Sequence, residues 1–215
     1  MLRGLCLLVV SLCSIFLLAA ETSCVKNEGG YSTPNEVWDA YRQAMHKGRW
    51  KDAFRHLTPR SQEYCVQGFV FIAAYVRGGP DKDSAAKLKA ILGKHGLDLD
   101  QIEPEAEKVT SKAEVAAYVD QLNQRVKDKE QLFHDVMSVL EPKLPWPRDK
   151  RGKRVIIWGK LTAVTVVGDT AIGKCMEKLD QNDVFEIGGV RQTEREAEIA
   201  FRKLNGRWFV EQRPE

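Results

Sequence analysis

The spacing of the apolar residues changes near residue 154, and this change constrains the fold more than any other feature of the chain. Before it, apolar residues recur at helical spacing, as in Val37, Ala40, Tyr41 and Ala44. After it, the sequence RVIIWGKLTAVTVVGDTAIGKCMEK is rich in β-branched residues and contains the turn signal Gly168-Asp169. The chain is therefore predicted to be α+β, with helices first and a curved antiparallel sheet last.

The N-terminal helices have clear start signals. Thr33, followed three residues later by Glu36, predicts a capping box. A short helix with Trp50, Ala53, Phe54 and Leu57 on one face is expected next, and Thr58-Pro59 starts a third helix. That third helix contains YCVQGFVFIAAYV, which is apolar almost all round, so we expect it to be buried on several sides.

Residues 78–153 are predicted to form a helical insertion between these helices and the sheet. Ser111 and Glu114 predict a second capping box, and the polar run 128–130 interrupts the apolar stripe that follows it. The segment LDLDQIEPEAEK is predicted to be a solvated acidic loop. It lacks the third ligand position and the glycine of a calcium loop, so no metal site is predicted there.

The C-terminal sequence predicts a hairpin with one buried face. Asn205-Gly206 suits the positive φ angles of a type I′ turn. Before the turn, Ala197, Ile199 and Phe201 alternate with charged residues, and after it Trp208 and Val210 share one side. We expect the N-terminal helices to pack on this apolar face.

The first 20 residues, MLRGLCLLVVSLCSIFLLAA, are typical of a secretory signal peptide. Cleavage after Ala20 is expected to give a periplasmic or extracellular protein with a tether over residues 21–32. The apolar run is shorter than the roughly 20 residues that span a bilayer comfortably. Membrane attachment would need an uncleaved signal or a lipid on Cys24, and Glu21 is unsuited to a lipoprotein site.

Cysteine usage and charge exclude several classes of function. Cleavage would leave Cys24, Cys65 and Cys175, and both a Cys65–Cys175 bridge and buried free thiols fit this set. A net charge of +3 requires no nucleic-acid or membrane partner. The basic run RDKRGKR, residues 148–154, is interpreted as a solvated loop, and without interleaved aromatic residues it does not predict nucleic-acid binding.

Three segments resemble the nuclear transport factor 2-like superfamily, which includes the ketosteroid isomerases and polyketide cyclase-like proteins. They are TPNEVWDAYRQAMHKGRWKDAFRHLTP, LTAVTVVGDTAIGKC and KLNGRWFV. The resemblance covers residues 33–77 and 155–213. It implies a single cone-shaped α+β domain over residues 33–215, with the insertion at 78–153 and a pocket at the wide end of the cone.

Two functions fit this resemblance. The first is a non-catalytic exported module that binds a protein partner or a small apolar ligand, and the alternative is a small isomerase or dehydratase with one proton-transfer residue. His46 and His56 fall off the apolar stripes and are expected to be exposed, and the four histidines are too dispersed for a metal site. The predicted inward residues of the sheet are apolar, which favours the module without catalytic residues, metal or cofactor. The residues predicted to line a ligand pocket are Tyr41, Phe54, Tyr64, Phe201 and Trp208.

Overall fold

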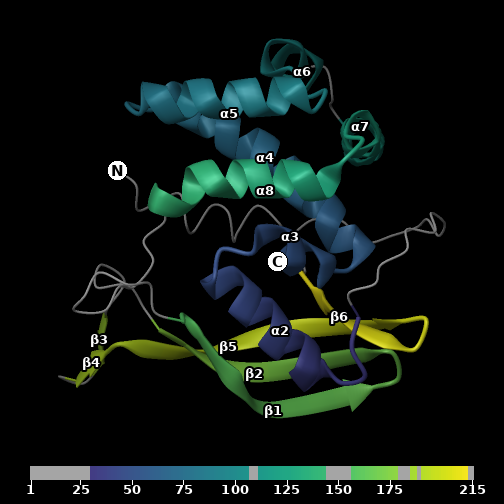
Figure 1. The fold of residues 1–215 in the computed structure, drawn as a ribbon, viewed down its shortest axis with the longest axis vertical. Helices are drawn as coiled ribbons and strands as arrows, with labels where there is room; N and C mark the ends of the chain where they lie inside the picture. Colours follow the sequence, from purple (N-terminus) through teal and green to yellow (C-terminus); the bar gives the residue numbers. More distant parts are fainter. Residues whose placement is uncertain (1–29, 107–110, 144–155, 179–184, 188–189, 213–215) are drawn as a thin grey trace. The chain divides into compact units, whose positions relative to one another are not determined.

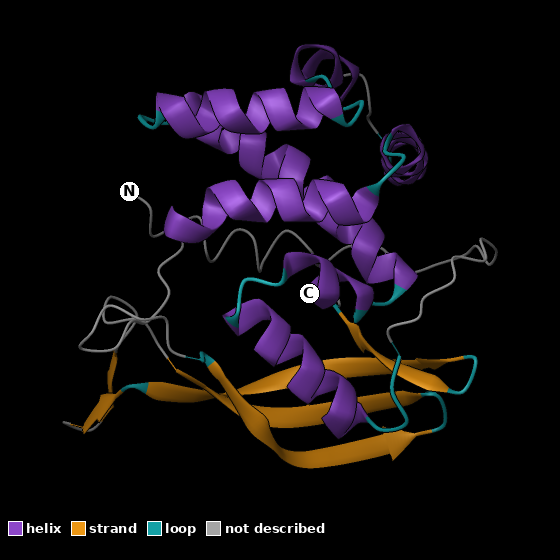
Figure 2. Ribbon diagram, in the orientation of Figure 1, coloured by secondary structure: helices purple, strands orange, loops and turns teal. Residues whose placement is uncertain are grey.

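A computed structural model describes residues 30–106, 111–143, 156–178, 185–187 and 190–212 (Figures 1 and 2). The predicted signal peptide, Cys24 and the basic run 148–154 lie outside this part of the chain, so the predictions made for them stay predictions. Within it, the helices precede an antiparallel sheet, and the predicted α+β class is confirmed.

The elements have the following bounds. The helices are α2 (Pro34–His46), α3 (Trp50–Arg55), α4 (Pro59–Gly78), α5 (Lys82–Lys94), α6 (Leu99–Ala106), α7 (Lys112–Arg125) and α8 (Lys129–Leu140), followed by a 3₁₀ turn at Glu141–Lys143. The strands are β1 (Trp158–Val167), β2 (Thr170–Lys178), β3 (Phe185–Ile187), β4 (Val190–Gln192), β5 (Glu194–Leu204) and β6 (Arg207–Glu211).

The described chain forms two compact units. We call residues 59–142, which contain α4 to α8, the helical unit. Residues 30–58 and 143–212, which contain α2, α3 and all strands, are the sheet unit. Helix α4 thus groups with the predicted insertion, whereas the resemblance associated it with α2 and α3. The single domain over residues 33–215 remains a prediction.

The sheet unit is built on four antiparallel strands in the order β1-β2-β5-β6. Both predicted hairpin turns are present. Asn205 and Gly206 have φ angles of 51° and 79°, which confirms the type I′ turn, and Gly168 has a φ of 59°. As expected, Ala197, Ile199 and Phe201 are more buried than their charged neighbours on β5.

Helix α2 lies across one face of this sheet and contacts β1 and β6 (Figure 1). Its start is the predicted capping box, in which Thr33 accepts from the backbone N–H of Glu36 and Glu36 accepts from that of Thr33. The core between helix and sheet contains Val37 and Trp38 of α2 and Phe201 of β5, which are at most 2% exposed.

Residues that precede α2 and follow α3 cover the outer edge of β6. Tyr31 exchanges two backbone hydrogen bonds with Trp208, of 3.1 and 2.7 Å. Val210 donates to the carbonyl of His56 and accepts from Thr58. An unpaired strand edge readily pairs with other chains, so this edge of the sheet is satisfied by the protein itself.

The helical unit has a core of its own, formed by residues such as Leu88, Leu92, Leu132 and Val136, each at most 1% exposed. The predicted break falls between α7 and α8, where the side chain of Asp128 caps α8.

The acidic segment near residue 100 is a helix, so the predicted loop was wrong. Leu97, Leu99 and Ile102 are at most 2% exposed. The amide of Ile102 donates to the carbonyl of Asp98, and α6 forms from there. Burial of these three apolar side chains outweighed the loop-like composition. None of the helices in the described ranges has the length and hydropathy of a membrane span.

Candidate functional site

The structure places four of the five predicted pocket residues in the sheet unit. Tyr41, Phe54, Phe201 and Trp208 are all at most 6% exposed there. Tyr64 lies on α4 in the helical unit, where Arg60 Nε donates to its hydroxyl over 3.0 Å. Tyr41 and Phe201 belong to one aromatic cluster, described next.

Trp38 is the centre of this aromatic cluster. Its ring lies 5.9 Å from those of Tyr41 and Trp158 and 6.5 Å from that of Phe201, centroid to centroid. Its indole N–H donates to the carbonyl of Gly159 over 2.9 Å. The rings are at the separations of aromatic pairs in protein cores. The rings of Tyr41 and Phe201 thus contact neighbouring rings.

The polar groups beside the cluster also bind within the chain. Arg42 is 8% exposed and donates to Asp39 Oδ1 over 2.6 Å. Glu177 accepts from Trp158 Nε1 over 3.2 Å and from Arg195 Nε over 2.6 Å. These contacts hold each charged side chain against a partner of its own sheet unit.

Cys175 is fully buried next to these residues and is a free thiol rather than half of a bridge to Cys65. Burial, assisted by the negative charge of Glu177 and opposed by Arg42, raises the pKa of the Cys175 thiol to about 11. Because the thiolate is the reactive form of cysteine, this side chain is protonated and unreactive at neutral pH.

His56 is buried, so the prediction that it is exposed was wrong. His56 is 8% exposed, and the centroid of its ring lies 5.4 Å from that of the Tyr31 ring. The reason is the backbone bond from Val210 to the His56 carbonyl, which fixes the end of α3 against β6. His46, at the end of α2, is half-buried. Helical spacing alone could not show the strand and the Tyr31 ring that cover His56.

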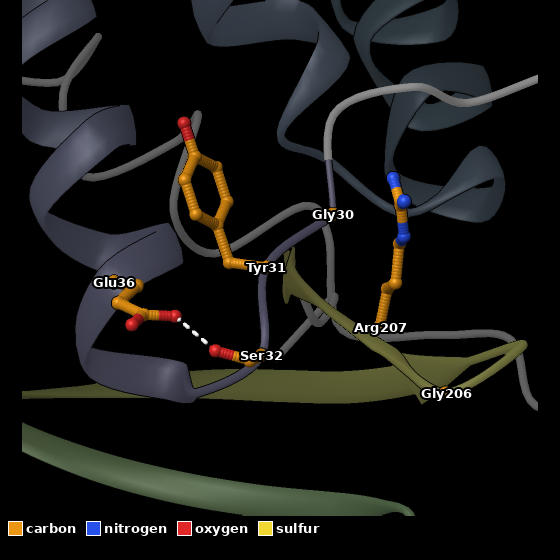
Figure 3. A pocket seen from close by; sticks show the side chains of 6 residues that line it. All are labelled: Gly30, Tyr31, Ser32, Glu36, Gly206 and Arg207. Atoms are coloured by element: carbon orange, nitrogen blue, oxygen red, sulfur yellow. Dashed lines mark hydrogen bonds between the residues drawn. The ribbon is translucent and has the colours of Figure 1, made fainter.

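A hollow of about 670 Å³ lies beside the β5–β6 hairpin, at the surface of the sheet unit. Its lining residues are Gly30, Tyr31, Ser32, Glu36, Gly206 and Arg207. Figure 3 shows the side chains of Tyr31 and Arg207 on either side of the Gly30 backbone. None of the five predicted pocket residues lines this hollow.

The two charged residues of the hollow differ in their contacts. Glu36 Oε2 accepts from the Ser32 hydroxyl over 2.6 Å and from the Thr33 amide over 3.2 Å. The bond from Ser32 lowers the pKa of Glu36, with smaller contributions from Thr33. The Arg207 guanidinium, in contrast, makes no ion pair or hydrogen bond with any residue that the structure describes. The hollow therefore contains an engaged carboxylate and an available cation.

Beside the hollow, the backbone at position 30 passes so close to β6 that this position requires a glycine. A Cβ there would lie 2.6 Å from Arg207 Cβ and from the Phe209 ring, closer than side-chain atoms pack. The sequence signal is the Gly pair at 29–30, which lies in the segment predicted to be a tether.

The helical unit contains a separate polar cluster that sequence spacing did not reveal. His95 Nε2 lies 3.1 Å from Asp135 Oδ2, although 40 positions separate the two residues. Asp135 also accepts from Gln131 and Lys94. The cluster joins the end of α5 to α8.

Comparisons with family models, curated proteins and solved structures find no match for this chain. Within the described ranges, no group of histidine, cysteine and acidic side chains is arranged to hold a metal ion. The geometry of the sheet unit is therefore the basis for a functional proposal.

Proposed function

We propose that the protein is an exported, non-catalytic binding module that uses the hollow beside the β5–β6 hairpin to bind an acidic segment of a partner protein. The observation that carries this proposal is the Arg207 guanidinium, which lines the hollow without an ion pair among the described residues. Arginine and tyrosine are enriched in protein interfaces, and a guanidinium binds a carboxylate through paired hydrogen bonds.

The shape of the hollow supports a partner segment rather than a deeply enclosed small molecule. Tyr31 is 36% exposed, and its ring is accessible for contact with an apolar side chain next to the carboxylate. Glu36 already accepts two hydrogen bonds, so its charge is partly compensated within the chain. The partner carboxylate would therefore bind Arg207 while its neighbours contact Tyr31.

The packing of the aromatic cluster supports a non-catalytic role. Proton-transfer catalysis needs an acid, base or hydroxyl within reach of a substrate. Tyr41 packs against two tryptophan rings, Arg42 is paired with Asp39, and the Cys175 thiol is protonated. These groups are occupied in holding helix α2 on the sheet.

Fluorescence anisotropy with two labelled peptides tests the proposal. We expect an Asp/Glu-containing peptide with one aromatic residue to bind, and its Lys-containing counterpart not to bind. Arg207→Gln should weaken binding at least about tenfold, the equivalent of one lost charged hydrogen-bonding partner. Lys178→Gln removes an equal charge from the exposed end of β2 and should leave binding unchanged.

Three results would contradict this function. Equal weakening by both variants would show general charge attraction instead of a site. Stabilisation by an apolar ligand set, lost on replacing Phe201 or Trp208, would favour an internal pocket. Turnover of a steroid-like or polyketide-like substrate that is lost on replacing Tyr41, His56 or Tyr64 would favour the enzyme.

Export is part of the proposal and has its own test. Mass spectrometry of the mature protein is expected to find an N-terminus at Glu21. A lipid-modified Cys24 or an intact N-terminus would place the module on a membrane instead.

A further inference from the structure

The two outer edges of the four-stranded sheet differ. Tyr31 and the chain around Leu57 bond to the edge of β6. At the other edge, β1 pairs with β2 on one side only, and no described backbone segment pairs with its outer side. Near the start of this strand, the Trp38 indole donates to the Gly159 carbonyl over 2.9 Å.

The second half of β1 is regular and apolar. Register shifts occur up to Ala163, and from Ala163 to Val167 the strand pairs with β2 without interruption. Val166 is 52% exposed and Val167 is 70% exposed. Proline, charge and bulge, which usually protect a strand edge, are missing from Ala163–Val167, since Lys160 and the register shifts come before it.

The hairpin turn identifies which backbone groups face outward. Val167 and Thr170 flank a two-residue turn with Gly168 at positive φ, so they form a hydrogen-bonded pair. Such pairs alternate with non-bonded ones along an antiparallel ladder. The N–H and C=O groups of Val164 and Val166 are therefore directed away from β2, toward the open edge.

We propose that this edge is a homodimer interface, in which β1 pairs antiparallel with β1 of a second copy. With Thr165 on the two-fold axis, Val164 would exchange both backbone hydrogen bonds with Val166 of the second copy, and Val166 with Val164. The two sheets would then form one continuous sheet through the interface. Thr165 would lie opposite its own copy as a non-bonded pair, with Cα atoms about 4.5 Å apart.

The composition of the strand is the reason to choose a second copy as the occupant. In this register residues 163–167 of one copy pair with residues 167–163 of the other, and no like charges oppose each other, because Lys160 lies outside this uncharged segment. Opposed threonines are a favourable cross-strand pair, and the exposed Val166 and Val167 side chains would be covered. Because a strand-edge contact is small, we expect a concentration-dependent equilibrium between monomer and dimer.

Sedimentation equilibrium of the full chain tests the interface with three variants. Val166→Pro removes an outward N–H that makes no bond to β2, and Thr165→Lys places like charges on the axis. Both should raise the dimer dissociation constant about tenfold or more. Ile172→Lys is the matched control, since it adds a charge to the same face of the sheet on β2, next to Thr165 but away from the edge. It should leave the dissociation constant unchanged.

A cysteine pair provides a second measurement that does not depend on the fold of the proline variant. Thr165→Cys should form a disulfide-linked dimer under mild oxidation, because the Cα separation of a non-bonded pair lies within the range of a disulfide. Ile172→Cys and the unmodified protein should not. A monomer at every concentration, a dimer abolished by Ile172→Lys but not by Val166→Pro, or equal crosslinking of both cysteine variants would overturn the proposal.

Discussion

At the scale of single residues, the clearest constraint is the lack of space above Gly173 on β2. A Cβ at this position would lie 2.8 and 3.0 Å from the methyl groups of Leu161 and 3.0 Å from the Phe201 ring. We expect Gly173→Ala to destabilise the sheet unit by about 1–3 kcal/mol, through overpacking. Urea unfolding followed by tryptophan fluorescence measures this, because Trp38, Trp50, Trp158 and Trp208 lie in that unit.

Gly68 on α4 is the matched control for that substitution. A Cβ there meets no atom within 4 Å, and alanine is the better helix former by about 0.8–1 kcal/mol. Gly68→Ala should therefore raise the stability of the helical unit, as measured by circular dichroism. A loss of stability in both variants would contradict the packing described for β2.

Asp135 in the helical unit gives a prediction for acid sensitivity. Burial raises the pKa of Asp135, but hydrogen bonds from His95, Gln131 and Lys94 outweigh it, and the pKa lies below the usual 3.8. A carboxyl with a lowered folded pKa stabilises the protein above its unfolded pKa and loses this contribution as pH falls through the folded value. Asp135→Asn should therefore destabilise the protein at neutral pH, and the difference should shrink below pH 3.8.

Urea midpoints of both proteins between neutral and strongly acidic pH measure this difference. Asp120→Asn removes an exposed carboxylate from α7 and is the control, with an expected difference near zero throughout. A pH-independent difference for Asp135→Asn would mean that lost packing, and not lost charge, causes the destabilisation.

At the scale of elements, the capping box of α2 is expected to contribute measurably because this helix covers the sheet. Thr33→Ala removes the hydroxyl that accepts from the Glu36 amide and should cost about 1 kcal/mol of unfolding free energy. Thr33→Ser keeps an oxygen at the same place and should cost much less. Equal loss in the two variants would show that the methyl group of Thr33, and not its hydrogen bond, is the stabilising group.

The elements that the sequence predicted are those with a local signal. Thr33 with Glu36, Ser111 with Glu114, and Asn205 with Gly206 each specify their conformation within a few residues, and the structure contains all three. The hollow, the burial of His56 and the His95–Asp135 pair depend on segments far apart in the chain. The spacing of apolar residues along the sequence carries no information about such contacts. The helices and hairpins could therefore be predicted from the sequence, and the candidate site could not.

At the scale of the whole molecule, the two units are expected to unfold with different midpoints. Each unit has buried apolar residues of its own, and the described tryptophans all lie in the sheet unit, whereas α4 to α8 supply most of the described helix. Fluorescence and far-UV circular dichroism should therefore give non-coincident urea transitions. Coincident transitions would show that the units unfold as one cooperative body.

Core substitutions assign each transition to its unit. Leu132→Ala on α8 and Phe201→Ala on β5 each remove a side chain with 0% exposure and should cost about 2–5 kcal/mol. The first should shift mainly the circular dichroism transition and the second mainly the fluorescence transition. If each variant shifted both transitions equally, the division into two units would not describe the energetics.

The backbone bonds between Tyr31 and Trp208 have a consequence for the order in which a growing chain can fold. Helices α4 to α8 are fully synthesised by Leu140, and the described part of their unit ends at Pro142, before the strands. The sheet unit needs both the segment before α2 and the strand that ends at Glu211. During synthesis, helices α2 and α3 therefore cannot pack on the complete sheet until almost the last residue has been added.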